Sequence, residues 1–300
     1  MTTIRRRTFL RTVAATSVPL TFGQRWTAAA IEDADQEFKL SLNQRSLRRS
    51  HAAGEWEHLR FAEIARREFD IDAVDYSSSF FKDRADDEDY LSQMNRQAAD
   101  QGVRQVLLMV DGEGALAAAD PDQRKIALNR HRLWIDAAAS LGCRGVCVRP
   151  LGDGKAEEQT KRFADSLASL NEHATERKIH VLISNDTGLA RNVDWLTRLV
   201  KDIGSARCGA FPLLGEAVQS DPYSDIPKWV SIAKGLGVLT HAFDSVGNHN
   251  GPDVPRILKS VLNAGYRGFI SLEYAGEDLD EFSGIRASQS LLARFESPLP

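Results

Sequence analysis

The sequence has few cysteines and no long apolar run. Its three cysteines, Cys143, Cys147 and Cys208, cannot form the even-numbered disulfide framework of a small secreted scaffold. We expect buried thiols instead, since Cys143 and Cys147 fall at a helix end and in a strand, a poor geometry for a shared metal. No stretch approaches the roughly 18 consecutive apolar residues of a membrane-spanning helix, so no stable membrane anchor is expected.

Charge is unevenly distributed along the chain. The whole sequence has a formal net charge of −4, from 38 lysines and arginines and 42 acidic residues. Residues 1–30 contain five arginines and no acidic residue, which leaves a net charge of −9 on residues 31–300. An acidic body repels the phosphate backbone of DNA and RNA, so a nucleic-acid partner is disfavoured.

The first thirty residues have the pattern of an export signal. A basic start that includes Arg6 and Arg7 is followed by Phe9-Leu10, a mildly apolar stretch over residues 13–22 and the small residues of 28–30. Paired arginines followed by x-Phe-Leu resemble the twin-arginine signal. We therefore expect a signal peptide over 1–30, a partner in the twin-arginine translocase and a periplasmic location in a bacterium. A disordered basic tail is the alternative.

The remaining residues, 31–300, are expected to form one α/β domain. Eight short runs rich in Val, Ile and Leu alternate with helical patterns, as in a parallel sheet with both faces covered. This alternation over about 260 residues predicts a (β/α)8 TIM barrel. A doubly wound open sheet is the alternative, but no Gly-x-Gly-x-x-Gly turn follows any predicted strand. The predicted strands are Phe38–Leu42, Ala73–Tyr76, Gln105–Val110, Gly145–Val148, His180–Ser184, Cys208–Pro212, Gly237–His241 and Gly268–Glu273.

Two of the predicted helices have readable ends. Asp120 followed by Pro121 predicts a helix start, because aspartate caps free N–H groups and proline suits the first turn; Gly142 predicts its end. Asn192 and Gly204 bracket a second amphipathic helix in the same way.

The active site of a (β/α)8 barrel lies at the carboxyl ends of its strands. His241 and Glu273 end two neighbouring predicted strands and can share a divalent cation such as Mn²⁺, Mg²⁺ or Zn²⁺. A hydrogen-bonded pair that caps the core is the alternative. Arg149 can bind a phosphate or carboxylate, or pair with an acid at the same rim. The predicted rim residues are Asp111, Glu113, Arg149, Asn185, Asp186, Glu216, His241, Asp244 and Glu273.

Six segments of the chain resemble a known family in content and in order. The family is the sugar phosphate isomerase/epimerase family of xylose isomerase-like TIM barrels, and the resemblance covers residues 38–295. With its first thirty residues included, the sequence is similar to bacterial members of this family that are exported by the twin-arginine route. The segments are Phe38–Leu42, Met109–Gly114, Ala139–Cys143, Asn192–Leu196, Ala264–Gly268 and Leu272–Gly276.

The resemblance implies one divalent metal ion, held by residues at the ends of four consecutive strands. Two positions match the family, with His241 as a ligand and Glu273 as both ligand and catalytic base. At the other two, where relatives carry Glu and Asp, this sequence has Ser184 and Leu213. A cation held by one imidazole and one carboxylate must complete its shell with water, so affinity falls.

Loop residues near these positions are candidate replacements. Asp186 lies two residues after Ser184, and Glu216 lies three residues after Leu213. Both could reach a metal if their loops fold inward. For them, as for Asp244 and His249, a capping or solvated role competes with ligation. We therefore expect a divalent ion (Mn²⁺, Mg²⁺ or Zn²⁺) to bind weakly or not at all.

The resemblance also implies a reaction. It is a proton transfer next to the carbonyl of a sugar or ketose-like substrate, with Glu273 as the base and a metal polarising the carbonyl. The residues expected to contact substrate are Asp111, Arg149, Asn185 and Asp244. A non-catalytic carbohydrate-binding barrel is the main alternative, and metal-free lyase or hydrolase chemistry is a third. Three-zinc endonucleases of this fold are disfavoured, because this acidic chain has only seven scattered histidines.

Overall fold

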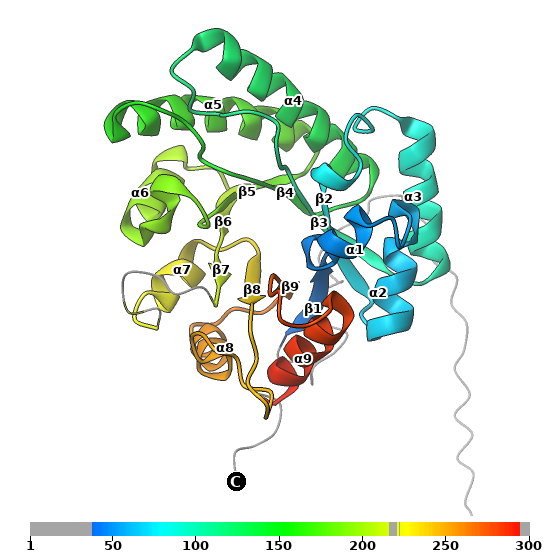
Figure 1. Ribbon diagram of the computed structural model, residues 1–300. Coiled ribbons are helices and arrows are strands. Elements are labelled where there is room, and N and C mark those ends of the chain that lie inside the picture. Colours follow the sequence, from blue (N-terminus) through cyan, green and yellow to red (C-terminus); the bar gives the residue numbers. More distant parts are fainter. Residues whose placement is uncertain (1–37, 216–220, 222, 295–300) are drawn as a thin grey trace, which may run out of the picture. The chain divides into compact units, whose positions relative to one another are not determined.

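The polypeptide folds into a nearly closed barrel of parallel strands surrounded by helices (Figure 1). The computed structural model describes residues 38–215, 221 and 223–294, so the predicted signal peptide at 1–30 lies outside the described residues. The strands are β1 (Lys39–Asn43), β2 (Ala73–Ser77), β3 (Arg104–Met109), β4 (Gly145–Val148), β5 (His180–Ser184), β6 (Cys208–Phe211), β7 (Leu213–Leu214), β8 (Leu236–Thr240) and β9 (Phe269–Tyr274).

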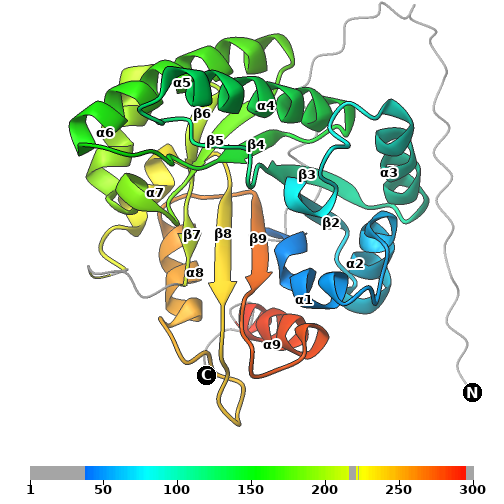
Figure 2. The same ribbon diagram turned by 45° about the horizontal axis from the view of Figure 1, so that its top comes forward.

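Helices connect successive strands and cover the outside of the barrel (Figure 2). None of the described helices has both the length and the apolar composition needed to cross a membrane. The helices are α1 (Arg48–Ala52), α2 (Phe61–Phe69), α3 (Glu88–Asp100), α4 (Pro121–Ser140), α5 (Ala156–Glu176), α6 (Val193–Ile203), α7 (Ile226–Ile232), α8 (Val254–Asn263) and α9 (Glu281–Ala293).

The described strands occupy eight positions around the barrel, which confirms the predicted (β/α)8 architecture. The hydrogen-bonded order is β6-β5-β4-β3-β2-β1-β9-β8-β7. Only Pro212 separates β6 from β7, so these two segments form one position: β6 pairs with β5, and β7 pairs with β8. A bridge between Ala210 and Ala233, and a 2.9 Å hydrogen bond from the Gly237 N–H to the Pro212 carbonyl, complete the closure.

The predicted strands agree with the observed ones to within one or two residues at each end. The ranges of β4 and β5 are the predicted ones, whereas β8 begins one residue earlier and ends before His241. The predicted run over 208–212 is one residue too long, because proline has no N–H for the ladder and β6 ends at Phe211. The short β7 was not predicted.

The apolar core has two layers. One lies between the strands and the helices, and the other fills the inside of the barrel with side chains such as Met109, Leu182 and Phe211. Cys147 belongs to the inner layer. All three cysteines are buried free thiols, as the sequence predicts.

Both predicted helix starts are confirmed. The Asp120 carboxylate accepts hydrogen bonds from the N–H groups of Asp122 at 2.8 Å and Gln123 at 3.4 Å, and Pro121 begins α4. The Asn192 side chain accepts from the Trp195 N–H at 2.9 Å at the start of α6. These bonds satisfy N–H groups that have no partner inside the helix.

Candidate functional site

Three of the predicted rim residues form one ionic cluster at the carboxyl ends of β3, β4 and β5. Arg149 donates from Nη1 to Oδ1 of Asp111 at 2.6 Å. It donates to Oδ2 of Asp186 from Nε at 2.9 Å, and its Nη2 lies 2.8 Å from the same oxygen. All three side chains are at least three-quarters buried. Arg149 is therefore the cation of a cluster with two carboxylates. Of the two roles predicted for it, the structure shows the salt bridge with acids at the same rim.

The cluster is held in place and keeps its charge. Ser77 donates its hydroxyl to Oδ2 of Asp111 at 2.8 Å, and the Asp111 N–H donates to Oγ of Ser78, also at 2.8 Å. Burial alone would lower the pKa of Arg149. The charge of Asp111 and the bonds to Asp186 outweigh this effect and raise that pKa above its ordinary value.

Glu273, at the carboxyl end of β9, is the least satisfied carboxylate of the site. Its side chain is 6% exposed, and Oε1 lies 3.5 Å from Nε of Arg45, in the short turn after β1. Its Oε2 is buried and has no hydrogen-bond partner among the described residues. A buried carboxyl oxygen without a partner is costly in a structure that has no use for it.

The pKa of Glu273 is raised above its ordinary value. Burial is the main cause, because it disfavours the charged form. Arg45 opposes this rise, whereas the neighbouring negative charges of Asp111 and Asp186 add to it. The side chain is thus a carboxyl group suited to exchange a proton closer to neutral pH than an exposed glutamate.

Arg45 is a site residue that the sequence reasoning missed. It comes two residues after β1, at the same edge of the barrel as the polar residues that follow the other strands. The rule that selected those residues, a polar side chain just past a predicted strand, applied to it as well. Arg45 lies in a stretch that also contains Arg48 and Arg49, so it did not stand out as a single polar residue at a strand end.

Asn185, Ser184 and Leu213 shape the centre of the site. The Asn185 side-chain oxygen accepts the Leu213 N–H at 2.8 Å, which fixes β7 against the end of β5. Ser184 and Leu213 are both buried. They line a small cavity of about 10 Å³ with the residues around them. The remaining lining residues are Arg45, Met109, Val110, Asp111, Cys147, Arg149 and Phe211.

His241 lies just beyond the end of β8. Its backbone N–H donates to Nε2 of His249 at 3.1 Å, and the two rings lie 6.4 Å apart, centre to centre. Within the part of the chain that the structure describes, the His241 side chain makes no hydrogen bond or ion pair with Glu273. Burial lowers the pKa of His249, and the nearby His241 lowers it further.

Of the other predicted rim residues, Asp244 and Glu113 make local hydrogen bonds, and Glu216 is not among the residues that the structure describes. Asp244 is exposed and accepts from the N–H groups of Val246 at 3.0 Å and Asn248 at 2.8 Å, which shapes its own loop. These bonds lower the pKa of Asp244. Glu113 accepts the indole N–H of Trp134 at 2.9 Å. Glu216 lies outside the described residues.

The described side chains do not fit a divalent metal ion. No group of three or more His, Cys, Asp or Glu residues is arranged to hold one within residues 38–215, 221 and 223–294. Ser184 offers a neutral hydroxyl and Leu213 offers no ligand atom. The cations beside the carboxylates are the guanidinium groups of Arg45 and Arg149.

Solved structures of sugar epimerases share this fold. A D-tagatose 3-epimerase-like protein aligns with a TM-score of 0.68 and 19% identity, over 86% of this chain and 97% of that chain. D-psicose 3-epimerase from Clostridium cellulolyticum H10, solved with D-tagatose, gives 0.67 and 12% over 86% and 98%. A xylose isomerase-like TIM barrel protein from Mycobacterium smegmatis, in complex with magnesium, gives 0.61 and 14% over 86% and 97%.

Comparison of the sequence with models of protein families identifies the family to which the chain belongs. No curated protein matches the chain. The profile of the family described as xylose isomerase-like TIM barrel matches residues 61–295. The matched range contains Arg149, His241 and Glu273, and it begins at the first residue of α2. The chain therefore belongs to the xylose isomerase-like TIM barrel family.

Proposed function

We propose that this barrel binds a small sugar or sugar derivative at the carboxyl ends of its strands and transfers a proton next to the sugar's carbonyl group. The observation that carries the proposal is Glu273, whose buried Oε2 has no partner among the described residues and whose pKa is raised. The solved neighbours named for D-tagatose and D-psicose support a sugar as the substrate class.

The chemistry follows from the charges around Glu273. Its ionised carboxylate takes the proton from the carbon beside the carbonyl, which leaves an enediolate with negative charge on oxygen. Arg45 and Arg149 carry permanent positive charge at this site and stabilise that oxygen. Return of the proton to the adjacent carbon, while a hydroxyl proton passes between the two oxygens, completes an isomerisation.

The described site offers one available carboxylate rather than two. Asp111 and Asp186 are both engaged by Arg149, whereas Glu273 keeps an unpartnered oxygen. Epimerisation by two bases needs an acid–base group on each face of the substrate, but a proton shift along one face needs a single group. We therefore favour isomerisation over two-base epimerisation for this chain.

We further propose that divalent metal binding is weak or lost in this member of the family. A bound metal would supply Lewis-acid polarisation of the carbonyl. Ser184 and Leu213 stand where the family resemblance expects a glutamate and an aspartate, so two negative charges are missing. Arg45 and Arg149 already pair with the carboxylates at this rim, so a metal ion would have to displace a guanidinium group to bind them.

Solvent-deuterium exchange tests the proposed proton transfer. Candidate ketoses such as D-fructose and D-tagatose are incubated with the full-length protein in D₂O, and NMR follows deuterium at the carbons beside the carbonyl. We expect exchange with the unmodified protein and a loss of about a hundredfold or more with Glu273→Gln, the usual effect of removing a general base. Glu277→Gln, the same change at an exposed position, is the matched control.

The same assay separates the roles of metal and protein. Exchange that survives EDTA and is unchanged by added Mn²⁺ supports a reaction that needs no divalent metal ion. Exchange that appears only with Mn²⁺ contradicts the proposed loss of the metal site. Equal exchange in Glu273→Gln and Glu277→Gln contradicts the assignment of Glu273 as the base.

A carbohydrate-binding barrel without turnover is the second candidate function. The observation that favours it is that Ser184 and Leu213 stand where the family resemblance expects two acidic ligands, which a barrel that only binds a sugar does not need. Saturable binding of a sugar by titration calorimetry, with no deuterium exchange in the assay above, would establish this function in place of the first.

We also propose that the protein is exported in a folded state by the twin-arginine translocase and acts in the bacterial periplasm. The support is in the sequence alone: Arg6 and Arg7, the Phe9-Leu10 that follows them, and the small residues at 28–30.

A further inference from the structure

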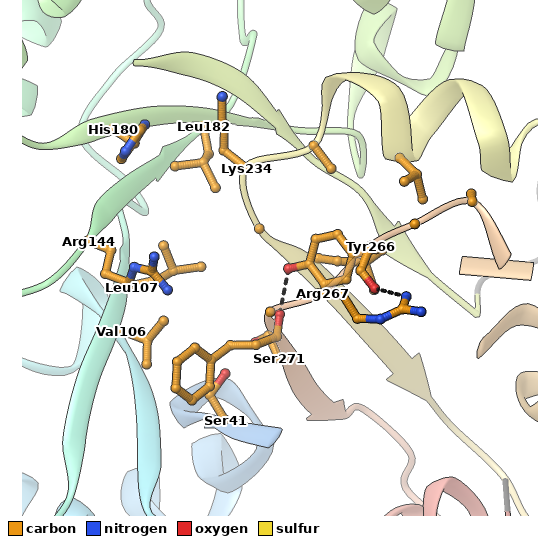
Figure 3. A pocket seen from close by; sticks show the side chains of 18 of the residues that line it. Ser41, Val106, Leu107, Arg144, His180, Leu182, Lys234, Tyr266, Arg267 and Ser271 are labelled. Carbon is orange, nitrogen blue, oxygen red and sulfur yellow. Dashed lines mark hydrogen bonds between the residues drawn. The ribbon is translucent and has the colours of Figure 1, made fainter. Parts of the chain in front are cut away.

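A second pocket opens at the opposite end of the barrel, among the amino ends of the strands (Figure 3). Its volume is about 500 Å³, far larger than the cavity beside Ser184. Arg144 immediately precedes β4, His180 begins β5, and Lys234 lies two residues before β8. The pocket is therefore separate from the candidate site at the carboxyl ends.

Small residues leave this space open. The barrel interior of this fold is normally filled by branched side chains, but Ser41, Gly235 and Ser271 line the pocket here. A Cβ atom added at Gly235 would lie only 2.9 Å from a methyl group of Leu182, so no larger residue fits at this position without a shift. The inner wall is apolar and is formed by Val106, Leu107, Leu182, Leu236 and Phe269.

Positive charge collects at the mouth of the pocket. Arg144, His180 and Lys234 all line it, and no aspartate or glutamate does. Among the described residues, the side chains of Arg144 and Lys234 form no ion pair, and Nδ1 of His180 is buried without a hydrogen-bond partner. Burial lowers the pKa of His180, and Arg207, Lys234 and Arg144 lower it further through their charges.

The other polar groups of the pocket are engaged elsewhere. Arg267 donates to the carbonyl groups of Leu262 and Tyr266, at 2.9 and 2.7 Å. The hydroxyl of Ser41 donates to the fully buried Asp75 at 2.5 Å. The unpaired cations at the mouth are thus the groups available to a ligand.

We propose that this pocket binds a small organic anion, with its apolar body against the inner wall and its carboxylate or phosphate group at Arg144 and Lys234. Charged groups of this kind form the strongest hydrogen bonds with arginine and lysine, and a concave apolar wall with a few converging polar groups is the usual form of a small-molecule site. The proposal does not depend on the reaction assigned to Glu273.

A fluorescence titration of the full-length protein tests this site. The probe is 8-anilinonaphthalene-1-sulfonate, an organic anion with apolar rings that brightens in an apolar pocket. Competition with benzoate and with phenyl phosphate distinguishes a carboxylate from a phosphate ligand, and benzyl alcohol is the neutral control. We expect at least one of the two anions to displace the probe and benzyl alcohol to leave it bound.

Variants that remove one positive charge each show whether the anion binds at Arg144 and Lys234. We expect Lys234→Gln and Arg144→Gln each to weaken binding of the displacing anion about tenfold, the effect of one lost charge-assisted hydrogen bond. Lys234→Arg keeps the charge and is expected to bind like the unmodified protein. Lys201→Gln, at an exposed position of α6, is the matched control and is expected to change nothing. Thermal unfolding followed by circular dichroism checks that each variant is folded.

Two results would overturn the proposal. One is equal affinity of the unmodified protein, Lys234→Gln and Arg144→Gln for both anions. The other is loss of binding in Arg45→Gln while Lys234→Gln binds normally, which would put the anion at the other end of the barrel.

Discussion

Glu273 and Arg45 form an ion pair between the end of β9 and the turn after β1, with Oε1 3.5 Å from Nε. These two strands are neighbours in the barrel, although they lie near opposite ends of the sequence. The pair leaves Oε2 of Glu273 without a partner among the described residues. One oxygen of this carboxylate is thus held by the ion pair, and the other is left for the proton transfer that we propose.

Removal of Arg45 is expected to raise the pKa of Glu273. The positive charge of Arg45 favours the ionised carboxylate, and Arg45→Gln removes it while burial persists. The pKa is measured by NMR titration of the glutamate side-chain carbons. Arg60→Gln, which breaks the exposed pair of Arg60 with Glu63, is the control. An unchanged or lowered pKa in Arg45→Gln would contradict the assignment.

Asp75 is expected to make the protein less stable as pH rises. Burial raises its pKa from 3.8 to about 6, against the hydrogen bonds from Ser271 and Ser41. Between these values the folded chain holds a proton that the unfolded chain has lost, so stability falls as pH increases through this window and stays lower above it. The shift corresponds to about 3 kcal/mol in order of magnitude.

The variant Asp75→Asn is expected to remove this dependence. Its free energy of unfolding, measured with urea at pH 4 and pH 7, is expected to rise relative to the unmodified protein as the pH increases. Asp100→Asn, at the exposed end of α3, is the control and is expected to follow the unmodified protein. Parallel curves for all three proteins would count against a raised pKa at Asp75.

Loss of Arg149 is expected to destabilise the fold. Arg149→Met leaves Asp111 and Asp186 without their cation, and breaking a largely buried pair in this way costs about 3 kcal/mol. Adding Asp111→Asn and Asp186→Asn to Arg149→Met removes the uncompensated charges and is expected to recover part of the loss. Urea unfolding measures all three steps, and an additive series without recovery would show that packing, not charge, explains the effect.

Restoring two acids is expected to restore metal binding. Ser184→Glu and Leu213→Asp together are expected to raise the affinity for Mn²⁺ more than either change alone, because both ligands act on one ion. Calorimetric titration with Mn²⁺ and Zn²⁺ measures this. A stoichiometric metal retained by the unmodified protein after dialysis would contradict the expected weak site, and Asp186 and Glu216 would then be the first residues to replace.

The paired arginines are expected to direct export. Replacing Arg6 and Arg7 with lysine keeps the charge of the basic start but removes the arginine pair on which the twin-arginine signal depends. Cell fractionation is expected to find the variant in the cytoplasm and the unmodified protein in the periplasm. Equal export of both proteins would show that another signal is used.

Strand positions and helix starts could be predicted because local signals determine them. The buried runs of β4 and β5 stand where their Val, Ile and Leu content puts them, and Asp120 caps α4 as its side-chain chemistry requires. Pro212 is the informative exception. Its missing N–H ends β6 at Phe211, and the short β7 that follows lies beyond the predicted strand.

The positions of the polar residues at the strand ends could be predicted, but the partners of their side chains could not. The sequence placed Asp111, Arg149 and Asp186 at successive strand ends, but whether the arginine meets substrate or acid depends on side-chain geometry. The pocket around Lys234 gave no sequence signal, because its lining comes from strand interiors and from residues just before strands, which share no motif. The rule that active sites lie at the carboxyl ends of barrel strands points to the opposite end of the barrel.

The break between β6 and β7 at Pro212 links the closure of the barrel to the small cavity beside Ser184. β7 meets β8 through only two residue pairs, Leu213 with Gly237 and Leu214 with Val238. Leu213 also lines the cavity beside Ser184. β8 and β9, by comparison, are joined by five residue pairs, so β8 is paired over a much shorter length on its β7 side. Because Leu213 takes part in both, the closure of the barrel and the shape of this cavity depend on the same residue.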